Sequence, residues 1–457
     1  MRHMIALGGT GHNRVVLAKL WPLRLPTKIL FVVNNDSSIM KPSINFLTSA
    51  VGTVTVLLSL SALPAIAVTE TEPNNSFTER EVFGAGVDTV EGAITPGDVD
   101  FFSFSDLAAG DLFFAEITSG DFDTVLGLFD DVGTLIDDDD GGVDVLSALG
   151  GTVPSSGNLN FAVSGFSDFN FTGAHSQTGT FTFNLRTIGS PVLTPITPLG
   201  GFDFADPDGI AFDASSGNLF IVSDDDANDV QVISEVTTDG TLVDTFELPD
   251  SPDVEGLSVL PNGNLLIAEQ DDENSAVQEI APDGSGEISG GISFLTDPPS
   301  DDGDGVVFNP QTNTVFVADD VDEAIVEFDL SGNLLSTIDT TALFPGFDEP
   351  EGITVDLLTG NLFVVDDSGG TSFLFEIATD GTLISGIDLE NLTGFDDPEG
   401  VTIDSESRTL YIAFADQDRV ESFQLPSPPT SVPEPGMALA VVFSSGVAVR
   451  RLRRAKA

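Results

Sequence analysis

The residues of this chain best suited to chemistry are carboxylates that recur at a fixed interval. Five times an acidic residue stands directly before a glycine that opens a short apolar run, as in Glu351-Gly352-Ile353. The five glycines lie 47, 49, 47 and 48 residues apart. The acidic residues are Asp208, Glu255, Asp304, Glu351 and Glu399. Oxygen-only ligands suit Ca²⁺ better than transition metals, so the pattern suggests a calcium site as a hypothesis.

Each repeat is predicted to form four short strands. The run after each glycine is rich in β-branched residues, and a Gly-Asn turn follows it at Gly217, Gly263 and Gly360. An Asp-Gly or Ser-Gly turn precedes a fourth strand in four repeats. Such turns favour hairpins because glycine accepts the positive φ that they need. A period in the forties filled with short strands is typical of a β-propeller with four-stranded blades.

The repeats predict five blades within 188–425, and a sixth, degenerate blade stays open. The fifth repeat ends at Leu425, after its third strand, and a lone strand-like segment at 191–197 precedes the first repeat. We expect this N-terminal strand to pair with the last blade. That pairing closes the ring and removes the open edges that a linear array would leave.

The strand order predicts that the acidic residues share one face of the propeller. The first two strands of a blade form a hairpin, so the first starts where the second ends. The five acids should then ring the mouth of the central channel. The ends of the second strands add Asp224, Glu269, Asp319, Asp366 and Asp416. Like charges roughly 6–8 Å apart repel by about 2 kcal/mol per pair at an effective dielectric near 20, so such a ring needs protons or a cation. Alternatively, the repeat has copied a solvated structural acid five times.

The composition excludes several classes of partner and chemistry. The chain has 457 residues, a net charge of −59 and no cysteine. Between positions 68 and 430 the only basic residues are Arg80, Arg186, Arg408 and Arg419. This body repels nucleic acid and anionic lipid. Disulfides and thiolate metal sites are impossible, and the propeller region has no histidine or lysine for nucleophile activation.

An export signal is predicted at 40–67. Met40 and Lys41 precede a largely apolar stretch, and Ala65 and Ala67 form the small-x-small pattern of a signal peptidase cleavage site. Residues 1–39 do not look like such a signal, and we interpret them as an over-extended gene start. The mature chain would begin at Val68. A retained N-terminal membrane anchor is the alternative interpretation.

The C-terminal segment 432–457 carries a specific short motif. A Pro-Glu-Pro tripeptide follows the linker 426–431 and precedes an apolar run and a basic cluster. The motif residues are Pro433, Glu434, Pro435, Arg450, Arg451, Arg453 and Arg454. The segment resembles the PEP-CTERM sorting signal of Gram-negative, exopolysaccharide-producing bacteria, although its apolar run is shorter than the roughly 20 residues of a membrane span. The resemblance implies export to the cell surface or extracellular matrix. Signal peptidase and exosortase would be processing partners, and the membrane would be contacted only through the terminal signals before processing.

Residues 69–187 predict a small β-sandwich from alternating strands such as FFSFS. Their landmarks are EPNNS at 72–76, GDVDFFSF at 97–104 and an Asp-rich loop at 137–140. In this order they resemble the bacterial pre-peptidase C-terminal family, which is attached to secreted enzymes and surface proteins. A second calcium candidate consists of Asp98, Asp100, Asp137, Asp138, Asp139 and Asp140. This set lacks the spacing of an EF-hand, and a solvated acidic turn is the alternative.

The propeller repeats, with their PEG and GNLFV patterns, resemble NHL-type and gluconolactonase-type propellers. The resemblance implies a calcium ion in the central channel. The expected fold is therefore all-β, with two classes of function open. One is a non-catalytic, calcium-stabilised binding or adhesion module that contacts exopolysaccharide or surface proteins. The alternative is a calcium-dependent hydrolase of lactonase, esterase or phytase-like type.

Overall fold

The computed structural model divides the chain into two compact units, 63–428 and 1–62 with 429–457. In the first unit it describes residues 66–427 except 85, 140–141, 143–144, 197–198, 200–204, 226–229, 249–252, 271–274, 284–285, 287, 297–298, 301–302 and 369–370. In the other unit it describes only the backbone of five short strands. These are β1 (Ile5–Ala6), β2 (Asn13–Leu17), β3 (Phe31–Asn34), β4 (Val54–Thr55) and β35 (Ala440–Val441).

Most of the predicted processing signals lie outside the described residues. This holds for Ala65 and for the whole sorting motif, Pro433, Glu434, Pro435, Arg450, Arg451, Arg453 and Arg454. Ala67 is described and belongs to β5 (Ile66–Thr69). This strand pairs in parallel with β7 (Val87–Ile94), and Ala67 lies opposite Thr89. Among the described residues, no helix combines the length and apolar character that a membrane crossing requires.

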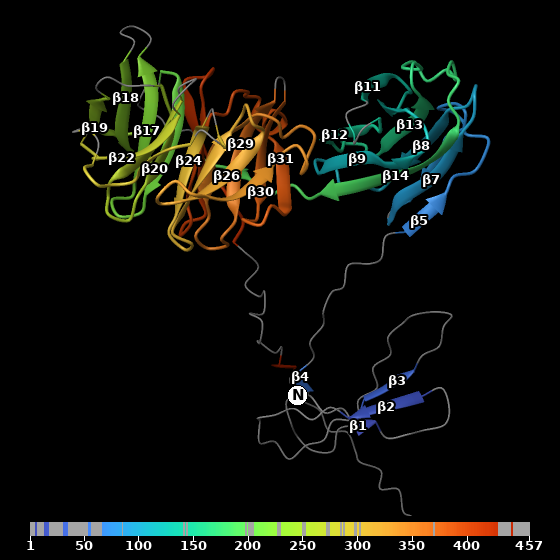
Figure 1. Cartoon of the computed structure of the whole chain (residues 1–457), viewed down its shortest axis with the longest axis horizontal. Helices are drawn as coiled ribbons and strands as arrows, with labels where there is room; N and C mark the ends of the chain where they lie inside the picture. Colours follow the sequence, from blue (N-terminus) through green and yellow to red (C-terminus); the bar gives the residue numbers. More distant parts are fainter. Residues whose placement is uncertain are drawn as a thin grey trace, which may run out of the picture. The chain divides into compact units, whose positions relative to one another are not determined.

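The larger unit begins with a sandwich of two five-stranded sheets (Figure 1). The sheet orders are β11-β10-β13-β8-β6 and β12-β9-β14-β7-β5. Beyond β5, the strands are β6 (Glu81–Phe83), β7 (Val87–Ile94), β8 (Asp100–Phe104), β9 (Leu112–Gly120), β10 (Thr124–Phe129), β11 (Leu135–Asp139), β12 (Ala148–Thr152), β13 (Leu159–Gly165) and β14 (Gly179–Ile188). Phenylalanines fill the space between the sheets, and the rings of Phe102 and Phe183 meet edge to face at 4.9 Å.

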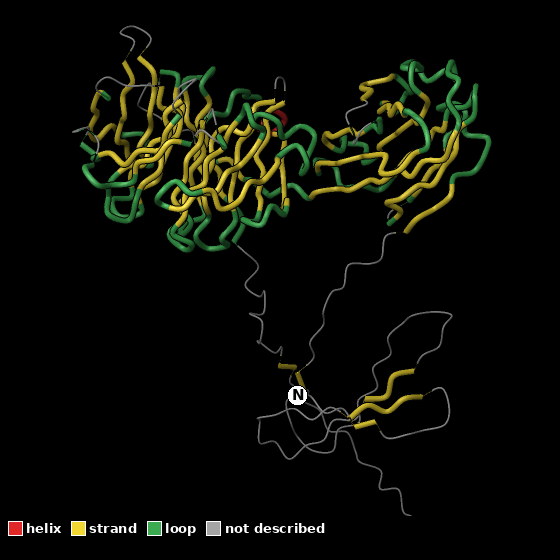
Figure 2. The backbone as a smooth tube through the Cα atoms, in the orientation of Figure 1, coloured by secondary structure: helices red, strands yellow, loops and turns green. Residues whose placement is uncertain are grey.

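The rest of the unit is a five-bladed propeller, as the repeat predicts (Figures 1 and 2). Blade 1 contains β16 (Pro207–Asp213), β17 (Asn218–Asp225), β18 (Val230–Thr237) and β19 (Leu242–Glu247); blade 2 contains β20 (Asp253–Val259), β21 (Leu265–Gln270), β22 (Ala276–Ile280) and β23 (Ser293–Leu295). Blade 3 contains β24 (Gly303–Asn309), β25 (Thr314–Asp319), β26 (Ala324–Asp329) and β27 (Leu334–Asp339). Blade 4 contains β28 (Pro350–Val355), β29 (Leu362–Ser368), β30 (Thr371–Ile377) and β31 (Leu383–Asp388), followed by the short helix α1 (Leu389–Thr393).

The fifth blade confirms the predicted closure. Its own strands are β32 (Gly400–Asp404), β33 (Thr409–Phe414) and β34 (Arg419–Gln424). The fourth place is taken by β15 (Thr194–Pro195), which lies antiparallel to β34 with Thr194 opposite Gln424. The strand that precedes the first blade in the chain is therefore the fourth strand of the last blade, and this pairing closes the ring. No sixth blade occurs in the part of the chain that the structure describes.

The repeating glycines mark the closest approach between blades. A Cβ atom added at each of them would lie within 3.0 Å of the carbonyl oxygen of the acidic residue in the next blade, a distance that real Cβ atoms essentially never show. The pairs are Gly209 with Glu255, Gly256 with Asp304, Gly305 with Glu351, Gly352 with Glu399, and Gly400 with Asp208. The last pair returns to the first blade, so the contacts form a closed ring. Only glycine fits these five positions.

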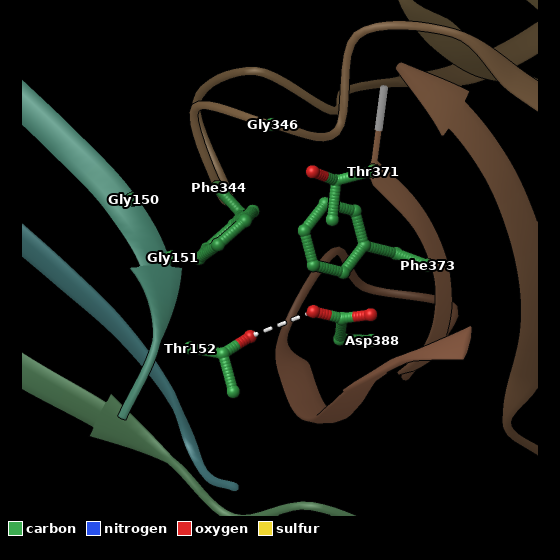
Figure 3. A pocket seen from close by; sticks show the side chains of 8 residues that line it. All are labelled: Gly150, Gly151, Thr152, Phe344, Gly346, Thr371, Phe373 and Asp388. Carbon is green, nitrogen blue, oxygen red and sulfur yellow. Dashed lines mark hydrogen bonds between the residues drawn. The ribbon is translucent and has the colours of Figure 1, made fainter. Parts of the chain in front are cut away.

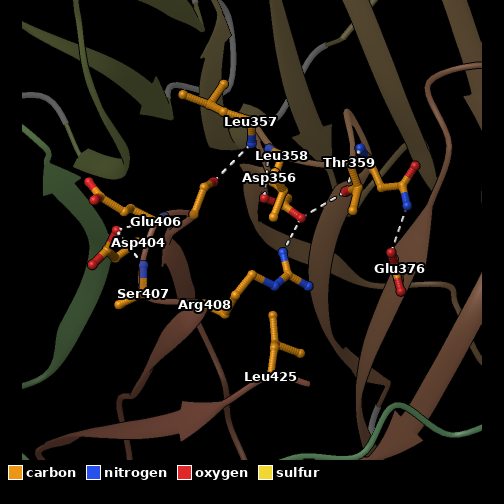
Figure 4. Close-up of polar contacts among 12 residues, drawn as sticks. Asp356, Leu357, Leu358, Thr359, Glu376, Asp404, Glu406, Ser407, Arg408 and Leu425 are labelled. Atoms are coloured by element: carbon orange, nitrogen blue, oxygen red, sulfur yellow. Dashed lines mark hydrogen bonds and ion pairs between the residues drawn. The ribbon is translucent and has the colours of Figure 1, made fainter. Parts of the chain in front are cut away.

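A buried ion pair joins blades 4 and 5 (Figure 4). Arg408 occupies the turn position that carries glycine in three other repeats, and it adopts a left-handed φ of 63°. Its guanidinium pairs with Asp356 of the neighbouring blade. Burial opposes the charge of Asp356, but hydrogen bonds from Leu358 and Thr359, together with Arg408, lower the pKa of Asp356 below its usual value.

The sandwich and blade 4 share a hydrophobic cluster. Leu112 and Ile188 of the sandwich strands are buried in the same cluster as Phe344, Phe347 and other blade residues. Next to it, the Arg186 guanidinium donates a hydrogen bond to the carbonyl oxygen of Leu343 at 2.7 Å. Experiments on the propeller are therefore best made on the full chain, because cutting between the domains would expose this cluster.

The ring of glycines predicts a strong substitution effect. We expect Gly400→Ala to reduce the free energy of unfolding by about 3 kcal/mol or more, because its Cβ would collide with the backbone of Asp208. Gly189→Ala is the matched control, since a Cβ there meets no atom within 4 Å. Denaturant unfolding of the full chain measures both. Equal stability of the two variants would contradict the proposed close packing.

Candidate functional site

The five repeating acids meet at one end of the innermost strands. Asp208, Glu255, Asp304 and Glu351 lie at the starts of β16, β20, β24 and β28, and Glu399 directly precedes β32. Because each glycine touches the backbone of the next acid, the five follow one another around the axis. We call this set of five residues the channel ring. The structure thus brings the predicted residues together, while the metal that they were predicted to bind stays a hypothesis.

The charges of the channel ring act on one another across the axis. Burial, with the neighbouring charge of Glu399 and others, raises the pKa of Glu351 well above its usual range. Burial, followed by the charges of Asp397 and Glu255, raises the pKa of Glu399 to about 8. Glu255 belongs to blade 2 and Glu399 to blade 5, so the interaction is not confined to adjacent blades. At neutral pH the folded ring therefore retains protons on some of its carboxyl groups.

The channel ring is not a compact ligand set. Asp304, which is 5% exposed, accepts hydrogen bonds from Gln270 Nε2 at 3.2 Å and from the backbone N–H of Asp320 at 3.1 Å. Within the described residues, no three ring carboxylates bring oxygen atoms within 4.8 Å of one another. A cation at the ring would therefore draw some of these side chains toward itself or be held partly through water.

The acids at the ends of the second strands differ from blade to blade. Asp319 and Asp366 are fully buried, Asp416 is exposed and Glu269 is partly buried, while the side chain of Asp224 lies outside the described part. Asp366 Oδ2 accepts the backbone N–H of Glu349 at 3.0 Å, whereas its Oδ1 has no hydrogen-bond partner among the described residues. Burial is the main cause that raises the pKa of Asp366 well above its usual value.

Another repeated acid has a structural role that the sequence analysis missed. In four blades a glutamate of the third strand accepts side-chain hydrogen bonds from residues in the second strand, in the turn before it, or in the fourth strand of its own sheet. In blade 4, Glu376 accepts one from Asn361 Nδ2 at 2.6 Å and one from Ser385 Oγ at 3.0 Å. The corresponding residues are Glu235, Glu279 and Glu327. These carboxylates therefore accept hydrogen bonds that link the strands within each blade.

The sandwich contains the tightest group of acids in the described chain. Carboxylate oxygens of Glu70, Glu72 and Asp100 all lie within 4.8 Å of one another. We call these three residues the sandwich acid cluster. Glu70 and Glu72 follow β5, and Asp100 opens β8, so the cluster ties the start of the sandwich to a central strand. Asn74 lies beside it and donates a hydrogen bond from its side-chain nitrogen to Glu70.

Asp100 is a buried carboxylate that lies beside two other acids. Its exposure is 0%, and neither carboxylate oxygen accepts a hydrogen bond from an N–H or hydroxyl group of the described residues. Burial and the charges of Glu70 and Asp98 raise its pKa to about 9. The side-chain oxygen of Asn74 is likewise buried without a partner. Three carboxylates and an amide oxygen are hard donors that match the preferences of Ca²⁺, and a shared proton is the other way to relieve the repulsion.

Only part of this cluster was predicted from the sequence. Of the expected residues, Asp100 belongs to it and Asp98 lies close enough to raise its pKa. Asp137, Asp138 and Asp139 form part of β11, paired with β10, and their side chains, like Asp140, lie outside what the structure describes. Glu70 and Glu72 were missed. The signal that could have found them is the alternation ETEPNN, in which two glutamates and an asparagine stand two residues apart.

Comparison with known proteins gives a likeness of fold alone. No family model matches the chain, and no curated protein matches it. Similar solved structures include a luciferin-regenerating enzyme (14% identity, 51% of this chain, 95% of that chain, TM-score 0.37). A gluconolactonase from Xanthomonas campestris is 18% identical over 53% of this chain and 99% of its own, with a TM-score of 0.33. A PQQ-bound aldose sugar dehydrogenase from Streptomyces coelicolor is 12% identical over 52% and 99%, with a TM-score of 0.35.

Proposed function

We propose that this chain is a calcium-binding protein whose sandwich and propeller form a calcium-stabilised binding module. The observation that carries the proposal is the buried, unpartnered carboxylate of Asp100 within 4.8 Å of Glu70 and Glu72. Such a group is unfavourable unless a proton or a cation compensates it. Glu70, Glu72, Asp100 and the amide oxygen of Asn74 would hold the ion, and water would complete the six to eight oxygen ligands that Ca²⁺ takes.

The channel ring supports the same proposal for the propeller. Its carboxylates converge from five blades, and residues 188–425 contain no lysine or histidine to neutralise them. Charge compensation by Ca²⁺ would replace the protons that Glu351 and Glu399 otherwise retain.

Calcium should therefore stabilise the folded chain. We expect millimolar Ca²⁺ to raise the thermal unfolding midpoint of the full chain by several degrees, since an ion bound only to the folded state adds stability. Asp100→Asn removes the central buried charge and should abolish the part of this rise that comes from the sandwich acid cluster. Asp131→Asn, an exposed acid of the same domain, is the matched control and should keep it. If calcium shifts all three proteins equally or none of them, the sandwich acid cluster is not the calcium site.

We also propose that the protein is exported to the cell surface or extracellular matrix. The support is the sequence alone, namely the signal at 40–67 and the tail at 432–457 that resembles a PEP-CTERM sorting signal. Signal peptidase and exosortase would then be its processing partners. Exopolysaccharide or other surface proteins would be the molecules that the module contacts.

The processing of the chain tests the export proposal. Protein recovered from the envelope or medium of the producing cell should begin at Val68, because cleavage is expected after Ala67. N-terminal sequencing or mass spectrometry gives the answer. A mature protein that keeps residues 40–67 and the Pro433–Pro435 tail, and that stays in the cytoplasm, would refute the proposal.

A second candidate function is calcium-dependent hydrolysis at the channel ring. The observation that favours it is the raised pKa of Glu351 and of Glu399, which supplies protonated carboxyl groups in a ring of carboxylates near neutral pH. One such group can act as general acid and an ionised carboxylate of the ring as general base, and a bound Ca²⁺ would polarise a carbonyl or phosphoryl oxygen. A gluconolactonase is among the proteins with a similar fold, so sugar lactones are the first substrates to test.

Measuring catalytic turnover distinguishes the hydrolase from the non-catalytic binding module. If the chain is a hydrolase, calcium-loaded protein should open sugar lactones, aryl esters or phytate, and Glu399→Gln should lower kcat by about 100-fold or more, as expected for loss of a general acid or base. Glu406→Gln, an exposed acid in a turn of the same blade, should leave turnover unchanged. The absence of turnover on all three substrate types would leave the binding module as the function.

A further inference from the structure

A cavity of about 230 Å³ lies where β12 of the sandwich meets blade 4 (Figure 3). The sandwich contributes two glycines and a threonine, and the propeller contributes two aromatic rings, a glycine, a threonine and a carboxylate. The lining residues are Gly150, Gly151, Thr152, Phe344, Gly346, Thr371, Phe373 and Asp388. Both domains are needed to form it, and it contains no residue of the channel ring or of the sandwich acid cluster.

The cavity contains one charged group, and within the described residues that charge has no cationic partner. Asp388 is 7% exposed and caps the N-terminus of α1. Its hydrogen-bond donors are all neutral: the backbone N–H of Asn391 at 2.8 Å, the side-chain amide of Asn391, and the Thr152 hydroxyl at 3.3 Å. The two ion pairs found in the described part of the chain involve other residues. A buried carboxylate of this kind favours a cationic neighbour.

The other walls are aromatic or open. The rings of Phe344 and Phe373 meet edge to face, with centroids 5.5 Å apart, and Figure 3 shows Phe373 next to Asp388. A Cβ at Gly346 would lie 3.4 Å from both rings, so glycine there leaves room between them. The negative face of an aromatic ring attracts cations, and more strongly when water is excluded.

These walls narrow the class of ligand. An anion is disfavoured because the lining has a carboxylate and neither arginine nor lysine. A bare Ca²⁺ is disfavoured because one carboxylate and two phenyl rings cannot supply its six to eight oxygens. A 150 Å³ apolar cavity accepts benzene, so this cavity has room for a ligand of about seven to ten non-hydrogen atoms.

We propose that this cavity binds a small organic ammonium ion. Its positive charge would pair with Asp388, its apolar carbons would contact Phe344 and Phe373, and a hydroxyl on the ligand would reach Thr152 or Thr371. The proposal is independent of calcium binding and goes beyond the function proposed above. It assigns a ligand site to the junction of the two domains, so that the bound molecule would also strengthen their contact.

Binding of choline and ethanolamine to the calcium-loaded full chain tests the proposal by titration calorimetry. We expect saturable binding of at least one probe with a dissociation constant below about 1 mM. Dimethylbutanol, the neutral isostere of choline, should not bind. Asp388→Asn should weaken binding at least tenfold, and its fold should be kept because asparagine is an equally good helix N-cap.

Two further variants make the result specific. Glu390→Gln removes an exposed charge two residues from Asp388 and should leave binding unchanged. Gly346→Ala places a methyl group 3.4 Å from both rings, at ordinary contact distance, and should weaken binding while the thermal unfolding midpoint is retained. The proposal is overturned if neither ammonium probe binds, if dimethylbutanol binds as well as choline, or if Asp388→Asn and Glu390→Gln weaken binding equally.

Discussion

Five glycines, each in contact with the carbonyl oxygen of the acidic residue in the next blade, are the constraint on which the propeller depends. They allow innermost strands to approach more closely than any side chain would permit, and they do so five times until Gly400 meets Asp208. The same contact fixes the backbone of every ring acid at one level of the axis. The convergence of the carboxylates is therefore a consequence of how the blades pack. Burial, together with the neighbouring acidic charges, raises the pKa values of Glu351 and Glu399.

The molecule has few cations of its own with which to compensate its acids. The two ion pairs of the described residues, Arg408 with Asp356 and Arg419 with Glu421, use half of the basic residues between positions 68 and 430. The other buried carboxylates depend on hydrogen bonds, on retained protons or on bound ions. The channel ring, the sandwich acid cluster and Asp388 are all acidic sites in a body that has few cationic side chains. Their proposed occupants are accordingly all cations.

Features that repeat along the sequence could be predicted, and features that form between distant segments could not. The period, the turn residues and the missing fourth strand of the fifth repeat predicted the five blades, the closing strand and the channel ring. Glu70 and Glu72 were missed because their alternation in ETEPNN does not show that folding brings them to Asp100. Arg408 was unpredictable for a similar reason: its left-handed backbone replaces a glycine turn, and only the neighbouring blade supplies Asp356. The shared core of sandwich and blade 4 leaves no periodic signal.

The convergence of buried carboxylates can be tested by measuring the free energy of unfolding of the calcium-free full chain between about pH 6.5 and about pH 9. Ordinary carboxyl groups are ionised throughout this range, whereas Glu399 and Asp100 titrate near 8 and 9 only in the folded state. The folded chain then binds more protons than the unfolded chain, so the account predicts stability that falls as the pH rises. Glu399→Gln should flatten the part of the decline near pH 8. A free energy of unfolding that stays constant or increases over this range would contradict the convergence of buried carboxylates.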